Sequence, residues 1–133
     1  MSWTVHSKVW LAVNDEPFMG EGRVEILRAI DRNGSILGAS TETGIPYRKI
    51  WGAIRHMERC VGYPLVIAQR GGAQGGGASL TDAARELMDR FQRLQAGIKE
   101  TTDGRFQGLF ADFFGKRYAE TAKRSVPRGG KSR

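Results

Sequence analysis

Basic side chains recur within the segment 46–60 at a spacing suited to contact a polyanion. Arg48, Gly52 and Arg55 follow one another at intervals of four and three residues, so on a helix they share one stripe. An arginine can donate two hydrogen bonds to the major-groove edge of guanine, a contact that discriminates between bases. We therefore expect this stripe to face the base edges of duplex DNA.

Other residues are expected to contact the sugar-phosphate backbone. Tyr47 and Lys49 flank the stripe, and their hydroxyl and ammonium groups are common partners of phosphate oxygens. The glycine-rich segment 69–79 permits a close approach of its backbone amides to phosphates. The expected DNA-binding positions outside the stripe are Ser35, Tyr47, Lys49, Arg70, Gly71, Gly72 and Gln74.

A helix-turn-helix would position the stripe. Ser35 is a suitable N-cap for a short helix over 36–43, Gly44 suits a sharp turn, and Pro46 suits the first turn of the next helix. The apolar residues of the second helix recur at spacings of four, three and four, which indicates one buried face. That face contains Ile50, Ile54, Met57 and Val61. From these residues alone, a surface helix pair with a solvated basic face remains an equal alternative.

The segments around the helix pair favour a winged helix. Alternation over 5–13 predicts a strand, the cluster 14–17 predicts a turn, and 20–31 predicts a first helix. After the second helix of the pair, 65–67 predicts a short strand that leads into the segment 69–79. That segment lacks the Lys-Ser/Thr of a phosphate-binding P-loop. It is either a flexible linker or the tip of a β-hairpin wing, and its position in the chain favours the wing.

A longer helix is predicted from Thr81, an N-cap, to about Gly97. Its apolar residues repeat at alternating spacings of four and three, the pattern of a seam between two helices. We expect this seam to form a homodimer, with packing on its own domain as the alternative. The expected dimerisation residues are Leu80, Ala84, Leu87, Phe91, Leu94 and Ile98.

The C-terminal part is predicted to start a separate helix after a break at 101–104. Aromatic residues recur at helical spacing over 106–118, and a basic, Pro/Gly-rich tail follows. Such a stripe packs on its own domain or across a dimer, or contacts a membrane surface or a further protein partner. The tail is expected to be disordered and to add phosphate contacts.

Composition narrows the classes of partner. The chain has 133 residues, a hydrophobic content of 40% and a formal net charge of +7, which favours a polyanionic partner. Neither a membrane span nor a signal peptide is expected, and a lone cysteine, Cys60, fits a reducing, cytoplasmic setting. The residues His6, His56 and Cys60 lack a metal-ligand spacing. We expect no metal, no cofactor and no enzymatic activity.

Several strings resemble the N-terminal DNA-binding domain of ModE-type molybdate-responsive regulators, which are related to LysR-type winged helices. They are GEGRVEILRAID, NGSI, GIPYRKIWGAI and the wing RGGAQGGGASLT, and the resemblance covers about residues 5–97. It implies DNA binding and transcriptional regulation. The family's molybdate-binding β-barrel domains are not expected here, because only about 35 residues follow the resemblance.

Together these patterns predict an α+β, mainly α fold: a winged helix-turn-helix over 1–80, a linker and dimerisation helix over 81–98, and a C-terminal amphipathic helix with a basic tail over 99–133. The expected function is a dimeric, sequence-specific transcriptional regulator with its recognition helix in the major groove of double-stranded DNA. The alternatives are a protein- or membrane-interaction module and a non-specific, nucleoid-type DNA binder.

Overall fold

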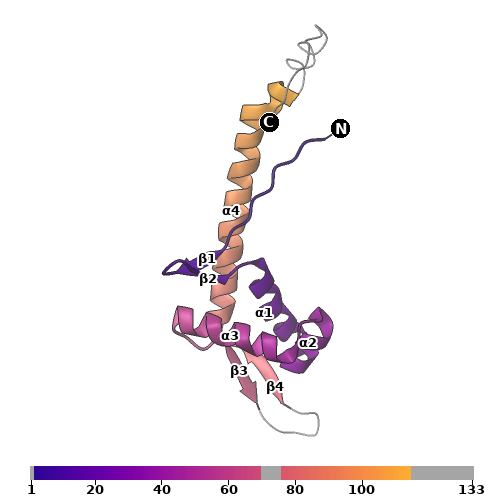
Figure 1. Cartoon of the computed structure of the whole chain (residues 1–133), viewed down its shortest axis with the longest axis vertical. Helices are drawn as coiled ribbons and strands as arrows, with labels where there is room; N and C mark the ends of the chain where they lie inside the picture. The colour runs from indigo at the N-terminus through magenta and orange to yellow at the C-terminus, as the bar shows by residue number, and fades with distance from the viewer. Residues whose placement is uncertain (1, 70–75, 115–133) are drawn as a thin grey trace, which may run out of the picture. The chain divides into compact units, whose positions relative to one another are not determined.

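The computed structural model describes residues 2–69 and 76–114, which fall into two compact units. One unit is Lys8–Gln95, and the described part of the other comprises residues 2–7 and 96–114. The elements are β1 (Leu11–Val13), β2 (Glu16–Met19), α1 (Glu21–Asn33), α2 (Ile36–Thr43), α3 (Tyr47–Val61), β3 (Val66–Gln69), β4 (Gly77–Leu80) and α4 (Asp82–Asp112) (Figure 1). This order is that of a winged helix-turn-helix, and the mainly helical α+β fold expected from the sequence is confirmed.

A short antiparallel hairpin precedes the helices. Asn14 and Asp15 both have positive φ, 49° and 64°, as the central residues of a two-residue hairpin turn require. The strand expected over 5–13 is wrong in length: only Leu11–Val13 is a strand, because β2 provides a partner of only four residues. The turn is likewise shorter than expected, since β2 already begins at Glu16.

Each helix of the three-helix core ends at a glycine in the left-handed conformation. The φ angles are 67° at Gly34, 76° at Gly44 and 84° at Gly62, values that glycine adopts without the steric cost a Cβ would add. The turn predicted at Gly44 is therefore confirmed, and it sets the entry of the chain into α3.

The helix starts are fixed by local contacts. The Ser35 hydroxyl accepts a hydrogen bond of 2.8 Å from the Gly38 amide, so the predicted N-cap is confirmed. A Cβ on Gly38 would lie 2.8 Å from the Cβ of Asn33 and 2.9 Å from the Ser35 Oγ, so this cap leaves no space for a side chain there. Pro46 is the N-cap of α3 rather than its first residue, because its ψ of 143° is extended; the helix begins at Tyr47.

The core lies between the inner faces of the helices and the two hairpins. The inward residues expected on α1 and α3 are fully buried, and Val61, the last residue of α3, is partly buried. The fully buried set comprises Val24, Leu27, Ile30, Ile50, Ile54 and Met57. Burying side chains of this size stabilises the fold by about 1.5–3 kcal/mol each, so this face of α3 is fixed toward the core.

The wing is held against the turn between α1 and α2. β3 and β4 pair antiparallel from Val66↔Leu80 to Gln69↔Gly77. The Ala78 amide donates a 2.8 Å hydrogen bond to the Gly34 carbonyl. Of the segment 69–79 predicted as the tip of the wing, Gln69 and residues 77–79 belong to the strands, and 70–75 lies outside the described residues.

One continuous helix replaces the two that the sequence suggested after the wing. The Thr81 hydroxyl caps it by accepting a hydrogen bond from the Ala84 amide, as predicted. The break expected at 101–104 is wrong, because α4 runs through it, and a Lys99–Asp103 ion pair of 2.9 Å spans it. Threonine and glycine cost a helix only about 0.7–1 kcal/mol each, too little to end it. The division into 81–98 and 99–133 therefore cuts one helix, and as a division of function it stays a prediction.

Most of the heptad-like apolar stripe, which runs from the end of β4 along α4, packs against the core of its own unit. Leu80, Ala84 and Phe91 are buried in the core cluster of their own unit, and Leu87 packs against it. Buried side chains have no surface left for a second chain, so for the three buried residues the packing interpretation replaces the seam. Leu94, at 43% exposure, remains open to solvent. Ile98 is partly buried. The dimerisation role stays a prediction.

Aromatic rings gather near the end of α4. Phe106, Phe110, Phe113 and Phe114 contact one another, with centroids 5.3–6.3 Å apart. Trp3 of the N-terminal segment stacks on Phe114 at 4.2 Å, a contact between sequence ends that periodicity does not reveal. The predicted aromatic stripe is thus a ring cluster as far as Phe114; its later members lie outside the described residues.

Candidate nucleic-acid interface

Four exposed positions form a stripe on α3 directly opposite its buried face. Arg48, Gly52, Arg55 and Arg59 are all exposed. At about 100° per residue they lie within about 60° of one another around the helix. We call them the cationic stripe. Three of them were predicted from the spacing, whereas Arg59 was not assigned to the site; its spacing of four from Arg55 would have included it.

Arg55 is held by a neighbour on its own helix. Its guanidinium carbon lies 5.2 Å from the centre of the Trp51 ring, within the range of a cation–π contact. Trp51 itself is partly buried and packs against the core. The ring therefore limits the rotamers of Arg55 while its N–H groups remain able to donate. An aromatic residue four positions before an arginine was the sequence signal for this contact.

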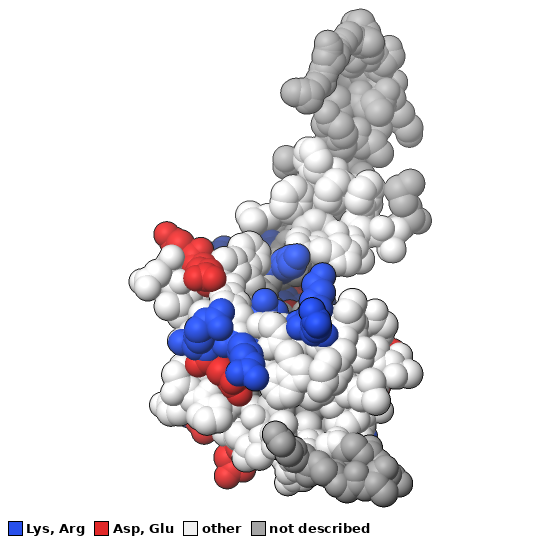
Figure 2. Space-filling model, turned by 60° about the horizontal axis from the view of Figure 1, so that its bottom comes forward, with Lys and Arg blue, Asp and Glu red and all other residues white. Residues whose placement is uncertain are grey.

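The acidic residue of α3 does not neutralise the stripe. The Glu58 carboxylate accepts hydrogen bonds from the backbone amides of Leu65 and Val66, at 2.8 and 3.2 Å. Among the described residues, no ion pair within 4.0 Å involves Arg48, Lys49, Arg55 or Arg59. Figure 2, which turns the lower end of Figure 1 toward the viewer, shows groups of Lys and Arg on this face, with most of the visible acidic side chains on the left, next to one of these groups. This face is therefore available to an anion.

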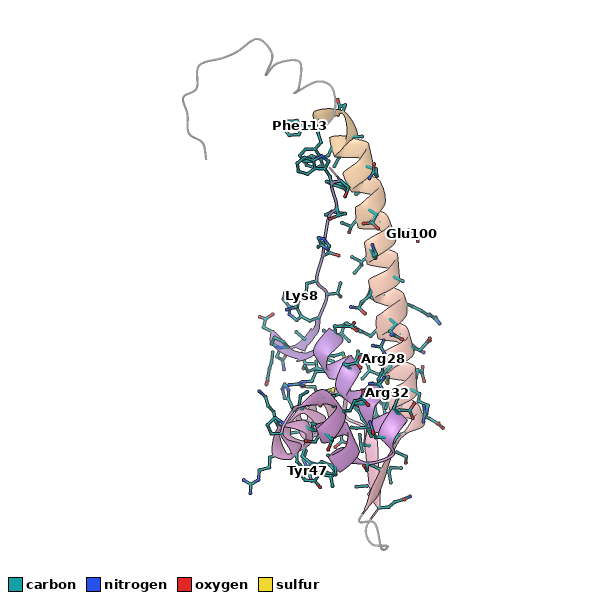
Figure 3. The ribbon with its side chains drawn as sticks, turned by 90° about the vertical axis from the view of Figure 1, so that its right-hand side faces the viewer. Lys8, Arg28, Arg32, Tyr47, Glu100 and Phe113 are labelled. Atoms are coloured by element: carbon teal, nitrogen blue, oxygen red, sulfur yellow. The ribbon has the colours of Figure 1, made fainter. Side chains whose placement is uncertain are left out.

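Tyr47 lies on the flank of α3 that faces the wing (Figure 3). It is 47% exposed. With Trp51 it lines a hollow of about 930 Å³, whose other walls come from α2 and from the strands of the wing, including Leu37 and Gln69. The expected residue Ser35 lines the same hollow, although its hydroxyl already accepts the cap hydrogen bond. The structure thus brings Ser35 and Tyr47 to one side of the stripe.

Lys49 lies on the opposite flank. It is exposed and lines a shallow depression with Gly44 and Arg23. Lys49 and Tyr47 therefore bracket the stripe, as expected. The four expected wing residues, Arg70, Gly71, Gly72 and Gln74, lie outside the described residues.

Polar contacts on the Lys49 side fix α3 to its neighbours. The His56 Nε2 lies 2.7 Å from a Glu16 carboxylate oxygen, and its Nδ1 lies 3.4 Å from the Arg23 guanidinium. The Cys60 sulfur lies 3.7 Å from the same His56 Nε2. Within the described residues, no three His, Cys, Asp or Glu side chains are arranged to hold a metal ion. These contacts join α3 to β2 and α1, an arrangement that spacing did not predict.

The segment 22–85 matches the family described as bacterial regulatory helix-turn-helix protein, LysR family. The chain therefore contains a LysR-type helix-turn-helix domain, in which α2 and α3 form the helix pair. Within the described ranges, no helix is long and apolar enough to span a membrane.

Its curated relatives include ModE-type proteins. The molybdenum-pterin-binding protein MopB of Rhodobacter capsulatus is 40% identical over 80 residues, which are 60% of this chain and 30% of MopB. The molybdenum transport protein ModE of Azotobacter vinelandii is 34% identical over 85 residues, 64% of this chain and 32% of the relative. The DNA-binding transcriptional dual regulator ModE of Escherichia coli K12 is 32% identical over 84 residues, which are 63% of this chain and 32% of that relative. The ModE-type resemblance is confirmed, and the chain spans under a third of each relative's length.

Two solved structures show weaker similarity. Full-length LTTR LysG from Corynebacterium glutamicum, with its effector Arg bound, aligns with a TM-score of 0.47 at 24% identity, over 68% of this chain and 30% of LysG. BpsR of Bordetella bronchiseptica, whose DNA binding is regulated by 6-hydroxynicotinic acid, aligns with a TM-score of 0.47 at 18% identity. The alignment covers 82% of this chain and 77% of BpsR.

Proposed function

We propose that this protein is a sequence-specific regulator of transcription that binds duplex DNA through α3. The observation that carries the proposal is the cationic stripe, which is exposed and has no acidic partner among the described residues. A helix-turn-helix places its second helix in the major groove, where such a stripe meets an uninterrupted anionic surface. The LysR-type domain and the ModE relatives support the same assignment.

The position of each residue around α3 divides the proposed roles. Arg48, Gly52 and Arg55 point directly away from the core, so in the groove they face the base edges. Tyr47 and Lys49 lie on the flanks, so they face the two phosphate backbones. The wing, with Arg70, Gly71, Gly72 and Gln74, would contact the phosphates beyond one side of α3, and Ser35 lies near that side.

We further propose that the protein acts as a homodimer through α4. Leu94 is exposed and continues the apolar stripe of the core-facing residues, and Ile98 follows it after one further turn. Two recognition helices would then read half-sites about 34 Å apart, one turn of DNA. Binding to chromosomal DNA would place the protein in the cytoplasm, and DNA with a second copy of the chain are its proposed partners.

DNA selection from a random duplex pool tests the proposal. At near-physiological salt, we expect an enriched inverted repeat that binds at least about a thousandfold more tightly than its scrambled sequence. Arg55→Ala should reduce the preference for the enriched duplex, whereas Lys49→Ala should weaken both duplexes alike. Equal losses for both duplexes in Arg55→Ala would remove its base-reading role. Binding without any enrichment would instead indicate a non-specific, nucleoid-type protein.

A second candidate function rests on the aromatic end of α4. Leu109, Phe110 and Phe113 are 40–67% exposed there, and a surface of this kind can bind another protein or an interfacial membrane layer. Sedimentation of the full chain with anionic vesicles, compared with Phe110→Ser, tests the membrane form. No sedimentation of either protein would exclude it.

A further inference from the structure

The cationic stripe contains hydrogen-bond donors and no side-chain acceptors. Its polar members, Arg48, Arg55 and Arg59, are all arginines, and a guanidinium donates but never accepts. In the major groove, guanine alone offers two adjacent acceptors, N7 and O6; adenine presents one acceptor and one donor, cytosine a donor, and thymine a single acceptor beside its methyl group. A donor-only stripe therefore matches guanine and has no complement for the adenine or cytosine amino groups.

The spacing along α3 converts into a spacing along DNA. Arg48 and Arg55 are seven residues apart, which at about 1.5 Å per residue is about 10.5 Å. Successive base pairs are about 3.4 Å apart along the duplex, so the two arginines are separated by about three base-pair steps when α3 follows the groove. Arg59 lies one turn further toward the C-terminal end of α3. Because a recognition helix contacts bases mainly with its N-terminal part, Arg59 is placed against phosphate.

Gly52 leaves open space between the two arginines. A Cβ built on Gly52 would meet no atom within 4 Å, so the fold does not require a glycine here. Glycine in the interior of a helix is nevertheless unfavourable. An exposed glycine at the centre of the stripe permits close approach of a ligand, here the base edges between the two arginine contacts.

We infer that each half-site selected by this domain carries two guanines about three base pairs apart, on either strand, read by Arg48 and Arg55 across Gly52. The inference rests on the proposed function and specifies the base chemistry of its target. Trp51 strengthens it, because an arginine already oriented by an aromatic ring loses less freedom when it binds a base.

Parallel selections with wild type, Arg48→Ala, Arg55→Ala and Arg59→Ala test the inference. Each variant removes one exposed charge from the same stripe. We expect the wild-type site to contain the guanine pair, Arg48→Ala and Arg55→Ala to lose one guanine each, and Arg59→Ala to keep both. An enriched site without the guanine pair, or with guanines that survive both substitutions, overturns the inference alone. If no duplex is enriched, the proposed function fails and the inference fails with it.

Base analogues then test the atoms involved. Replacing either guanine by 7-deazaguanine removes N7, and we expect affinity to fall about 5- to 150-fold, the range of one bidentate contact. Inosine keeps N7 and O6 and is the matched control, which should bind within a few-fold of guanine. The Arg55→Ala variant should be insensitive to 7-deazaguanine at one of the two positions. Equal sensitivity of wild type and both arginine variants would contradict the assignment.

Gly52→Ala tests the space between the arginines. The variant should raise the melting temperature, since alanine favours the helix, and should lower affinity for the selected site at least about tenfold by blocking the approach. Gly104→Ala on α4 is the matched control, because its Cβ would also meet no atom within 4 Å; it should leave affinity unchanged. Unchanged affinity in Gly52→Ala would show that DNA binding does not require a close approach of the bases to position 52.

Discussion

The two longest helices in the described part of the chain, α3 and α4, both expose arginine and lysine, but ion pairs within the helix involve these residues only on α4. On α4, Arg90 pairs with Glu86, Arg93 with Asp89 at 3.2 Å, and Lys99 with Asp103 at 2.9 Å, each across one helical turn. On α3, the acidic residue Glu58 is instead bound to backbone amides, and the stripe has no acidic partner among the described residues.

The comparison shows that the number of basic residues on a helix says little about its role. An acidic residue one turn away neutralises a basic residue locally, so α4 presents little net charge along its paired turns. The cations of α3 keep their full charge for an external partner. α1 resembles α4 in this respect and differs from α3: Arg28 and Arg32 follow one another along the helix (Figure 3), and both pair with Glu25, at 3.0 Å.

The apolar faces differ as well. The apolar residues on the inner face of α3 are buried in the core, whereas the stripe of α4 changes from Phe91, 1% exposed, to Leu94, 43% exposed, within one turn. The first part of α4 therefore belongs to the fold, and the next turn is open to a second chain.

Replacing Phe91 should have the largest effect on stability. Phe91→Ala removes a fully buried ring and leaves a cavity, so the free energy of unfolding should fall by about 3–5 kcal/mol. Leu94→Ala, the matched control, should cost less than about 1 kcal/mol in dilute solution because the side chain is half exposed. Urea denaturation measures both. A large loss for Leu94→Ala that grows with protein concentration would show that Leu94 is buried between two chains.

Reversing a charge should distinguish α3 from α4 most sharply in DNA binding. Arg55→Glu replaces a donor facing the DNA by a repelled carboxylate, so affinity for the selected duplex should fall by at least about a hundredfold. Arg93→Glu changes the charge by the same amount on α4 and should change affinity less than about threefold. Fluorescence anisotropy measures both. Comparable losses would mean that only net charge matters and that the contrast between the helices is without consequence.

Glu58 should contribute to stability through its backbone contacts. Glu58→Gln removes the negative charge from two hydrogen bonds with the amides of Leu65 and Val66, which should cost about 1 kcal/mol of unfolding free energy. Glu86→Gln on α4 breaks only an exposed ion pair and should cost less than about 0.5 kcal/mol. Thermal denaturation distinguishes them, and equal costs would contradict a structural role for Glu58.

Removing a single phosphate contact should have a small but specific effect. Lys49→Ala should lower affinity a few-fold and reduce the slope of log affinity against log salt by about one. Lys99→Ala on α4, where the lysine is paired with Asp103, should leave the slope unchanged. Titrations at several salt concentrations measure the slope, and an unchanged slope in Lys49→Ala would place its ammonium group away from the phosphates.

The sequence predicted the parts of this fold that depend on local chemistry. The Ser35 cap, the Gly44 turn and the buried face of α3 each follow from residue type and helical period, and all are confirmed. The order of a helix pair, a short strand and a glycine-rich segment was sufficient to predict the wing, although its second strand, β4, was not predicted. The stripe on α3 could be placed for the same reason, because its spacing is the complement of the buried face.

The parts that the sequence could not predict depend on contacts between distant residues. α4 is continuous because the helix-propensity costs in its middle are small and the turns on either side stabilise the helix by more. No single residue therefore signals this continuity. Whether Phe91 faces the core or a second chain depends on what packs beside it, and a heptad pattern is identical in both cases. The contacts of Trp3 with Phe114 and of His56 with Glu16 join residues far apart in sequence, which periodicity does not connect.

The smallest expected effect concerns the ion pair that joins α4 to α1. The Arg85 guanidinium donates two hydrogen bonds to Asp31, at 2.8 and 3.1 Å, and it holds the pKa of that carboxyl below its ordinary value. A carboxyl with a lowered pKa in the folded state adds stability at pH above its ordinary value of about 4, and this contribution is lost as pH falls through the lowered pKa.

The stability difference between wild type and Arg85→Gln should therefore be constant from about pH 8 to about pH 5 and should shrink below about pH 4. Because the pair is exposed, the difference is small even at neutral pH. Arg55→Gln on α3 is the matched control: its guanidinium has no carboxylate partner among the described residues, so its stability difference should not change with acid. Urea denaturation at each pH measures both variants. A difference for Arg85→Gln that persists at about pH 2 would mean that Arg85 stabilises the start of α4 through the packing of its side chain, and the contrast between paired α4 and unpaired α3 would not extend to this residue.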